Sequence, residues 1–284
     1  MNFDSAGWLD QASITKSPNL YTKNNSKEII IMHYTAGYSA SSAINTFKKK
    51  SASASAHFII DVDGSITQMV PTSQCAWHSG HGRYHGRSRV NDYSIGIEIV
   101  NPGYHFEQGD GSYVNWQHKP VSNSKLAPFP GMIEARDRWV GSREPSWPNF
   151  PEDQLDSLET LVKALLKTYP SLQDIVGHRD VDTVRKIKVD PGPAFPMRRF
   201  RMLLDNRHDD DSQPVPFKVS ISSGGLNVRG GPGTDFERMD WGPLYDGEFV
   251  ERIDTEGNWY LVRRWIEGNM KEGWVYSRYL VPCE

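Results

Sequence analysis

Cysteine and long apolar runs are scarce in this 284-residue chain, and neither sign of charge is in excess. The only two cysteines, Cys75 and Cys283, lie far apart without metal-type spacing, which excludes a disulfide framework and makes an oxidising compartment unnecessary. No apolar run approaches the length of a membrane span, and the polar N-terminus shows no signal peptide. We therefore expect synthesis in the cytoplasm and no membrane span.

The charge balance is almost even, with 32 Lys and Arg against 35 Asp and Glu. A nucleic-acid partner is not expected, because binding phosphates needs a basic surface excess. Aromatic residues make up 11% of the chain and include nine tryptophans. This content fits a surface that binds carbohydrate or peptide, but it also fits an ordinary core.

Apolar periodicity predicts an α/β domain over residues 1–205. Buried strands are expected at Glu28–His33 and Ser94–Val100, with a hairpin that turns at Asp63-Gly64. The clearest helix runs from Pro151 to Lys167, with leucines at helical spacing on one face. Residues 102–150 show no clear period, and we interpret them as a long ordered insertion with a short helix near Met132–Val140.

Composition shifts at residues 206–216, which are charged and contain proline and are interpreted as a linker. The short strands and turns of residues 217–284 predict a small all-β barrel. We expect the whole chain to be a monomer.

Polar side chains interrupt the apolar strands at three places: His33, Glu98 and His178. Asp190 and Lys188 follow His178 on a loop that two prolines and a glycine stiffen. Two histidines and an aspartate suit zinc and leave its fourth position open for water. Glu98, desolvated among isoleucines, would act as general base, and Lys188 would stabilise the oxyanion formed at an amide carbonyl.

Structural roles for the same residues stay open from the residues alone. A histidine at a strand end is more often a satisfied core residue than a ligand, and Glu98 could instead be the buried partner of Arg89 or Lys188. A structural role is favoured for His57. Five further histidines in polar loops are expected to be exposed: His81, His85, His105, His118 and His208.

Four blocks in order resemble the amidase-2 family of zinc N-acetylmuramoyl-L-alanine amidases, the AmpD- and AmiD-like enzymes. The blocks are Ile-Met-His33-Tyr-Thr-Ala, Ala-Trp77-His78-Ser-Gly, Asn91-Asp-Tyr-Ser-Ile-Gly-Ile-Glu98 and Gly-His178-Arg-Asp…Lys188-Val-Asp190-Pro-Gly-Pro-Ala-Phe. Together they are highly specific, although each alone is weak. The insertion between Pro102 and Phe150 looks longer than in the AmiD-like branch.

This resemblance implies a central mixed β-sheet flanked by helices, one Zn²⁺ and cleavage of the bond between N-acetylmuramic acid and L-alanine of the stem peptide. It implies metal ligation by His33, His178 and Asp190, with Glu98 and Lys188 as the catalytic pair. Residues in or beside the matching blocks are assigned to muropeptide binding: Tyr34, Trp77, His78, Arg89 and Asn91.

Residues 217–284 resemble a bacterial SH3 domain through Leu226-Asn-Val-Arg-Gly-Gly-Pro-Gly and Gly273-Trp-Val-Tyr. Such a module implies binding to cell-wall peptide, against the alternative of a packing partner without a ligand. Alternatives for the whole chain are a peptidoglycan-recognition protein that does not cut and a stem-peptide endopeptidase. We expect action at the cell wall, periplasmic or extracellular, with cytoplasmic recycling of fragments as the alternative.

Overall fold

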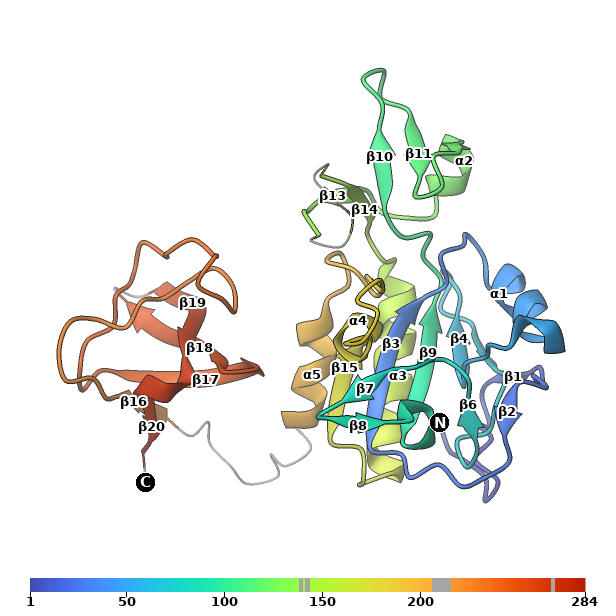
Figure 1. Cartoon of the computed structure of the whole chain (residues 1–284), viewed down its shortest axis with the longest axis horizontal. Helices are drawn as coiled ribbons and strands as arrows, with labels where there is room; N and C mark the ends of the chain where they lie inside the picture. The colour runs from blue at the N-terminus through green and yellow to red at the C-terminus, as the bar shows by residue number, and fades with distance from the viewer. Residues whose placement is uncertain (138–139, 141–143, 206–215, 267–268, 284) are drawn as a thin grey trace. The chain divides into compact units, whose positions relative to one another are not determined.

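The computed structural model describes residues 1–137, 140, 144–205, 216–266 and 269–283. Contacts within the chain divide it into two compact units, Met1–Phe200 and Arg201–Glu284 (Figure 1). The predicted linker at 206–216 lies mostly outside the described residues, so its boundaries stay a prediction. None of the helices in the described part of the chain combines the length and apolar character that crossing a bilayer requires.

A six-stranded sheet forms the centre of the first unit (Figure 1). Its strands, in order across the sheet, are β1 (Ser13–Ile14), β5 (Ile66–Gln68), β4 (Phe58–Ile60), β9 (Ser94–Ile99), β3 (Ile29–Tyr34) and β15 (Asp174–Gly177). Strands β4, β9, β3 and β15 run parallel, whereas β5 is antiparallel to β4. Their apolar residues, mostly isoleucines, are buried, as parallel strands covered on both faces require. The predicted α/β class with a mixed sheet is confirmed.

The first unit contains α1 (Ala40–Phe47), α3 (Glu152–Thr168) and α4 (His178–Val181), and α5 (Met197–Asp205) begins at its end. The predicted leucine face of α3 is buried, and the Nε2 group of Gln154 donates to the carbonyls of Ile60 and Val100 at the ends of two strands. Arg199 of α5 forms ion pairs with three carboxylates of α3. These contacts fix both helices to the sheet and to each other.

Short elements connect these parts. They are the strand pair β2 (Leu20–Tyr21) and β6 (Cys75–Ala76), the hairpin of β7 (Arg83–Tyr84) and β8 (Arg87–Ser88), and the 3₁₀ turns η1 (Lys50–Ala52) and η2 (Val90–Asp92).

Residues 102–150 form a second, antiparallel sheet, beyond the ends of β3 and β9 (Figure 1). Its strands, in order, are β12 (Pro120–Val121), β11 (Tyr113–Asn115), β10 (His105–Glu107), β14 (Ser146–Pro148) and β13 (Met132–Glu134), with α2 (Asn123–Leu126) after β12. The predicted helix near Met132–Val140 is wrong at its start, because residues 132–134 pair with β14.

The histidines predicted to be exposed in polar loops differ in their burial. His105 is fully buried on β10 and its Nε2 lies 3.0 Å from the hydroxyl of Tyr38, so the prediction that it is exposed is wrong. His208 lies outside the described residues. His81, His85 and His118 are exposed, as predicted.

The second unit is strand-rich, as predicted. Its sheet contains, in order, β19 (Asn269–Tyr276), β18 (Trp259–Ile266), β17 (Phe249–Glu256), β16 (Pro216–Val219) and β20 (Leu280–Pro282), with the 3₁₀ turn η3 (Ser277–Tyr279) before β20. Val228 and Leu226, from the Leu-Asn-Val-Arg motif, belong to its apolar core. Gly273 lets β19 pass Val228 closely, since a Cβ there would lie 2.4 Å from the valine side chain.

Candidate metal centre and active-site cleft

The first two site residues lie side by side because of strand register. His33 of β3 is paired with Glu98 on the parallel strand β9. Both residues lie near the carboxyl ends of their strands and line one cleft. The two side chains therefore lie together at one end of the sheet, as a shared site requires.

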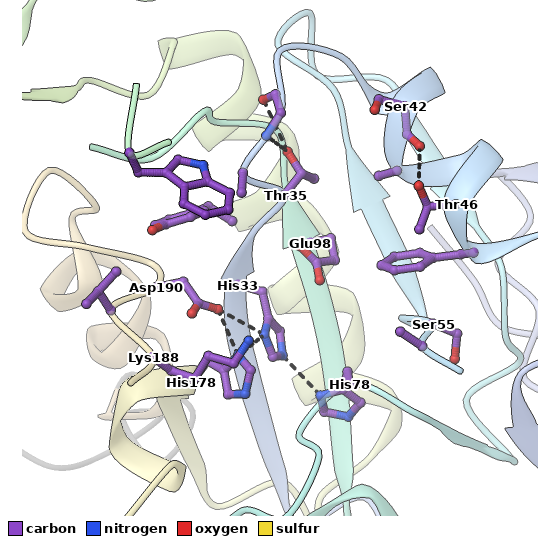
Figure 2. A pocket seen from close by; sticks show the side chains of 18 of the residues that line it. His33, Thr35, Ser42, Thr46, Ser55, His78, Glu98, His178, Lys188 and Asp190 are labelled. Carbon is purple, nitrogen blue, oxygen red and sulfur yellow. Dashed lines mark hydrogen bonds and ion pairs between the residues drawn. The ribbon is translucent and has the colours of Figure 1, made fainter. Parts of the chain in front are cut away.

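His178 and Asp190 complete a compact group of donor atoms around His33 (Figure 2). His178 begins α4 directly after β15, and the backbone N–H of Arg179 donates to the carbonyl of Asp190. The Nδ1 atoms of His33 and His178 lie 3.0 Å apart. Asp190 Oδ2 lies 3.2 Å from Nδ1 of His33 and 2.9 Å from Nδ1 of His178.

These donors fit a metal ion. Two imidazole nitrogens 3.0 Å apart can share only one proton, so a cation satisfies both lone pairs better than a hydrogen bond does. Ligand atoms of a tetrahedral zinc site, with bonds of about 2.0–2.1 Å, lie roughly 3.3 Å apart, a few tenths of an ångström more than here. All three side chains are buried, and Nε2 of His178 has no hydrogen-bond partner among the described residues.

Electrostatics keep two members of this group, His33 and Asp190, in the protonation states that a cation needs. Burial, followed by the charge of His178, lowers the pKa of His33 to about 4, so its imidazole is neutral at physiological pH. Burial raises the pKa of Asp190, but the charges of and hydrogen bonds from His178 and His33 outweigh this and leave it below its usual range. A neutral imidazole and a carboxylate are the forms that bind metal.

Glu98 carries an unsatisfied carboxylate beside this group. Its Oε2 atom is buried and has no hydrogen-bond partner among the described residues. Burial, followed by the negative charge of Asp190, raises its pKa well above the usual range for glutamate. A desolvated carboxylate of raised pKa suits proton transfer, and nearby positive charge would return it to the ionised form.

Lys188 lines the same cleft from a loop whose backbone is held by a buried carboxylate. Oδ2 of Asp182 accepts the backbone N–H groups of Ile187, at 3.0 Å, and Lys188, at 3.1 Å. Asp182 is only 3% exposed. Figure 2 shows the side chain of Lys188 extending toward His33 and His178. Sequence reasoning missed Asp182, although its place at the start of this polar loop was visible.

His78 lies beside His33 and lines the same cleft, although its side chain is largely buried. Its Nδ1 lies 3.0 Å from Nε2 of His33, and its Nε2 lies 3.1 Å from the hydroxyl of Ser94. Oδ1 of Asn91 accepts the backbone N–H groups of His78 and Ser79 and the hydroxyl of Ser79. Asn91 thus holds the loop that presents His78.

The other predicted substrate contacts divide into two groups. Tyr34 and Trp77 line the cleft, and the ring of Tyr34 packs on Gly103, where a Cβ would lie 2.8 Å from it. Arg89 is exposed and forms an ion pair with Asp92, 2.8 Å away, and neither Arg89 nor Asn91 lines the cleft in the described part of the chain. Substrate binding by these residues stays a prediction.

His57 lies further back in the sheet. Its Nδ1 accepts the backbone N–H of Gly96 and its Nε2 lies 2.9 Å from the carbonyl of Gln74. Both ring nitrogens are therefore committed to backbone groups, which supports the structural role that the sequence favoured.

The cleft, about 460 Å³ in volume, extends beyond the metal group. This volume is typical of a small-ligand site. Uncharged polar side chains that sequence reasoning missed line one part of it: Thr35, Ser42, Thr46 and Ser55. Trp116 and Tyr104, both from the insertion, line it too. Thr35 follows Tyr34 in one of the matching blocks, whereas no motif marks the others, because their segments meet only in the folded chain.

The insertion contacts the segment that carries the candidate ligands His178 and Asp190. Asp137, only 4% exposed, forms an ion pair with Arg179, the residue after His178, at 2.7 Å. The ring of Trp147 packs on Gly192, two residues after Asp190, so closely that a Cβ there would lie 2.7 Å from the ring. The insertion thus forms part of the site.

Curated relatives share the first unit with this chain. AmpD of Escherichia coli, a 1,6-anhydro-N-acetylmuramyl-L-alanine amidase, is 32% identical over 151 residues, which are 53% of this chain and 58% of AmpD. The N-acetylmuramoyl-L-alanine amidase AmiD of the same organism is 30% identical over 182 residues, which are 61% of this chain and 51% of AmiD. The chain thus spans about half the length of the curated relatives it matches.

A crystal structure of a selenomethionine derivative of AmpD shares the fold. It matches with a TM-score of 0.50 and 24% identity, covering 72% of this chain and 99% of that one. Residues 224–281 match the model of the bacterial SH3 domain. Residues 23–193, more than half of the chain and inclusive of all three candidate ligands, match the model described as N-acetylmuramoyl-L-alanine amidase. The chain therefore belongs to the N-acetylmuramoyl-L-alanine amidase (Amidase_2) family, with a bacterial SH3 domain after the amidase domain.

Proposed function

We propose that this protein hydrolyses the amide bond between the lactyl group of N-acetylmuramic acid and L-alanine of the stem peptide, in peptidoglycan or its fragments. The observation that carries the proposal is the buried group of His33, His178 and Asp190 with the unpartnered carboxylate of Glu98 in the same cleft. Family membership supplies the bond. The names of AmpD and AmiD point to the same linkage.

The metal in this proposal is zinc, held by His33, His178 and Asp190. Two nitrogen donors and one oxygen donor are a ligand set typical of hydrolytic zinc sites with an open position. When bound, the ion supplies a Lewis acid for the scissile carbonyl and lowers the pKa of water to about 7. The three residues orient the site and exclude bulk water from its floor.

Glu98 acts as the proton carrier. In its ionised form it takes a proton from the attacking water as the new carbon–oxygen bond forms. It then delivers that proton to the nitrogen of L-alanine as the carbon–nitrogen bond breaks. One water is consumed, and the products are a lactyl carboxylate and a free stem peptide with an α-amino group.

Lys188 stabilises the negative charge that develops on the carbonyl oxygen. Its ammonium group can do so from the mouth of the cleft, where its side chain extends toward His33 (Figure 2). Asp182 supports this role by holding the backbone N–H of Lys188. The lysine is thus placed before substrate arrives, which lowers the reorganisation cost.

The SH3 domain is proposed to retain the enzyme on the wall. Large side chains are exposed on this unit, among them Tyr245 and Phe249, each 57% exposed. A tethered second binding site raises the local concentration of enzyme on a polymer without changing the chemistry. Replacing both residues by alanine should weaken cosedimentation with sacculi and leave cleavage of soluble muropeptides unchanged. Unchanged cosedimentation would contradict a role for this surface.

Mass spectrometry of digested sacculi and of soluble anhydro-muropeptides tests the proposal. Free stem peptides that begin with L-alanine are expected, and their release should stop with a chelator and resume with zinc. The variant His178→Ala should lose bound zinc and activity together. Fragments cut within the stem peptide would instead indicate an endopeptidase, and binding without any product would indicate a recognition protein.

A further inference from the structure

We propose that His78 is a positioning residue that keeps the proton of His33 on Nε2 and so turns the lone pair of Nδ1 toward the metal. The inference rests on the proposed metal site. It concerns a chain of hydrogen bonds that begins at His33, passes through His78 and Ser94, and ends at the backbone carbonyl of Val90. We call this chain the His78 relay.

The direction of the relay is fixed at its far end. The hydroxyl of Ser94 lies 2.7 Å from the carbonyl oxygen of Val90. A carbonyl has no proton to donate, so at this distance the proton of the serine hydroxyl must lie between the two oxygens. The Ser94 oxygen can then only accept from its other neighbour, Nε2 of His78, 3.1 Å away.

The remaining protons follow in order. Because Nε2 of neutral His78 carries its proton, Nδ1 carries a lone pair and accepts from Nε2 of His33, 3.0 Å away. Nδ1 of His33 is left unprotonated and faces Asp190 and His178.

The strand β9 is shaped to hold this relay. Alternate residues of a strand share a face, so Ser94, Gly96 and Glu98 lie in one row. Ser94 bonds the ring of His78, and Gly96 leaves room for it, since a Cβ there would lie 2.4 Å from Cγ of His78. Ser94 is fully buried and His78 is 8% exposed, so water competes little for these bonds.

The two histidine ligands differ in this respect. Nε2 of His33 has a partner, whereas the buried Nε2 of His178 has none among the described residues. The relay therefore fixes the tautomer of His33 before metal binds, whereas His178 takes up its metal-binding tautomer when the metal binds. Partners of this outer kind typically change metal affinity by roughly 10- to 100-fold.

Nitrogen-15 NMR of the metal-free full chain at neutral pH reads the tautomer directly, with the signals of His33 assigned by their loss in His33→Ala. The wild type should show His33 protonated on Nε2. In His78→Leu, which offers no acceptor, His33 should shift toward the form protonated on Nδ1, facing Asp190. Zinc affinity, measured by competition with a chelating dye, should fall roughly 10- to 100-fold.

Two further variants and a control complete the experiment. His78→Asn retains an acceptor near the position of Nδ1 and should recover most of the affinity and the Nε2 tautomer. Ser94→Ala should give an intermediate loss. His118→Gln, at an exposed histidine of the insertion outside the relay, should leave the zinc affinity and the tautomer of His33 unchanged. Protonation of wild-type His33 on Nδ1, or an unchanged tautomer in both His78→Leu and Ser94→Ala, would overturn the inference. Failure of the wild type to bind zinc would instead overturn the proposed function, because the tautomer is read without metal.

Discussion

The cleft has two walls that differ in how firmly their side chains are held. The inner wall, on and behind β3 and β9, consists of His33, His78, Ser94 and Glu98, whose placement comes from strand register and buried hydrogen bonds. The outer wall consists of Ile187, Lys188 and Trp116, with Ile187 61% and Trp116 42% exposed. We propose that proton transfer relies on Glu98 of the inner wall, while the outer wall meets substrate.

The largest effect is expected on the inner wall, from Glu98→Gln. The substitution keeps the shape but removes the proton acceptor, so turnover should fall by roughly 10²- to 10⁴-fold. Zinc content, measured by elemental analysis, should stay at the wild-type level because Glu98 is outside the ligand group. Glu237→Gln, at an exposed residue of the other unit, is the control. Turnover that survives in Glu98→Gln would remove its role as base.

Lys188 tests whether the outer wall contributes to chemistry. Lys188→Ala should lower kcat by roughly 10²- to 10³-fold, as the loss of an oxyanion donor does, and should leave zinc bound. The neighbouring Lys186→Ala is the matched control, since Lys186 is exposed and does not line the cleft. A rise in KM at constant kcat would instead make Lys188 a substrate contact only.

The stability of the fold behind the inner wall should depend on pH through His57, whose ring contacts that of His78. Burial lowers the pKa of His57 to about 4 from 6.5, so the unfolded chain takes up a proton that the folded chain refuses. The contribution of His57 to the free energy of unfolding is complete above pH 6.5 and is lost as pH falls toward 4. The loss is about 2 kcal/mol between pH 6.5 and about 5. Urea unfolding of metal-free protein across this range measures it. His57→Gln should flatten the slope, and an equal slope in that variant would contradict the assignment.

Substitution of Asp182 tests whether the position of the Lys188 loop affects the reaction rate. Asp182→Ala removes the acceptor of two backbone N–H groups, so Lys188 should lose its position and kcat should fall by up to roughly 10²-fold. Asp182→Asn keeps one oxygen acceptor and should restore part of the rate. If Asp182→Ala were fully active, the loop would need no such anchor.

The sequence predicted those parts of the site that depend on local pattern. His33 and Glu98 stood out because a polar residue in an isoleucine-rich strand is unusual, and His178 and Asp190 because proline stiffens their loop. The predicted helix over Pro151–Lys167 matches α3 because its leucines follow helical spacing. These features are set by neighbours close in sequence.

The missed parts depend on distant pairing. His78 meets Ser94 only because its loop crosses β9 at Gly96. The sequence alone does not show that Gly96 is needed there to leave room for the imidazole ring. Met132–Glu134 became a strand because β14 provided a partner, which overrode its local preference. His105 looked like a loop residue and is buried for the same reason, on β10 between β11 and β14.

Trp116 gives the smallest and most specific test of the outer wall. It belongs to the insertion and lines the cleft while 42% exposed, so its ring can lie against an apolar face of a sugar or peptide. Trp116→Ala should raise KM for soluble muropeptide by roughly 2- to 10-fold with little change in kcat, because the contact is equally strong in ground and transition states. Tyr245→Ala, at an exposed aromatic residue of the other unit, should leave KM for the soluble fragment unchanged. A fall in kcat at constant KM would instead mean that the insertion acts through the metal-binding loop, which it reaches by way of Asp137 and Arg179.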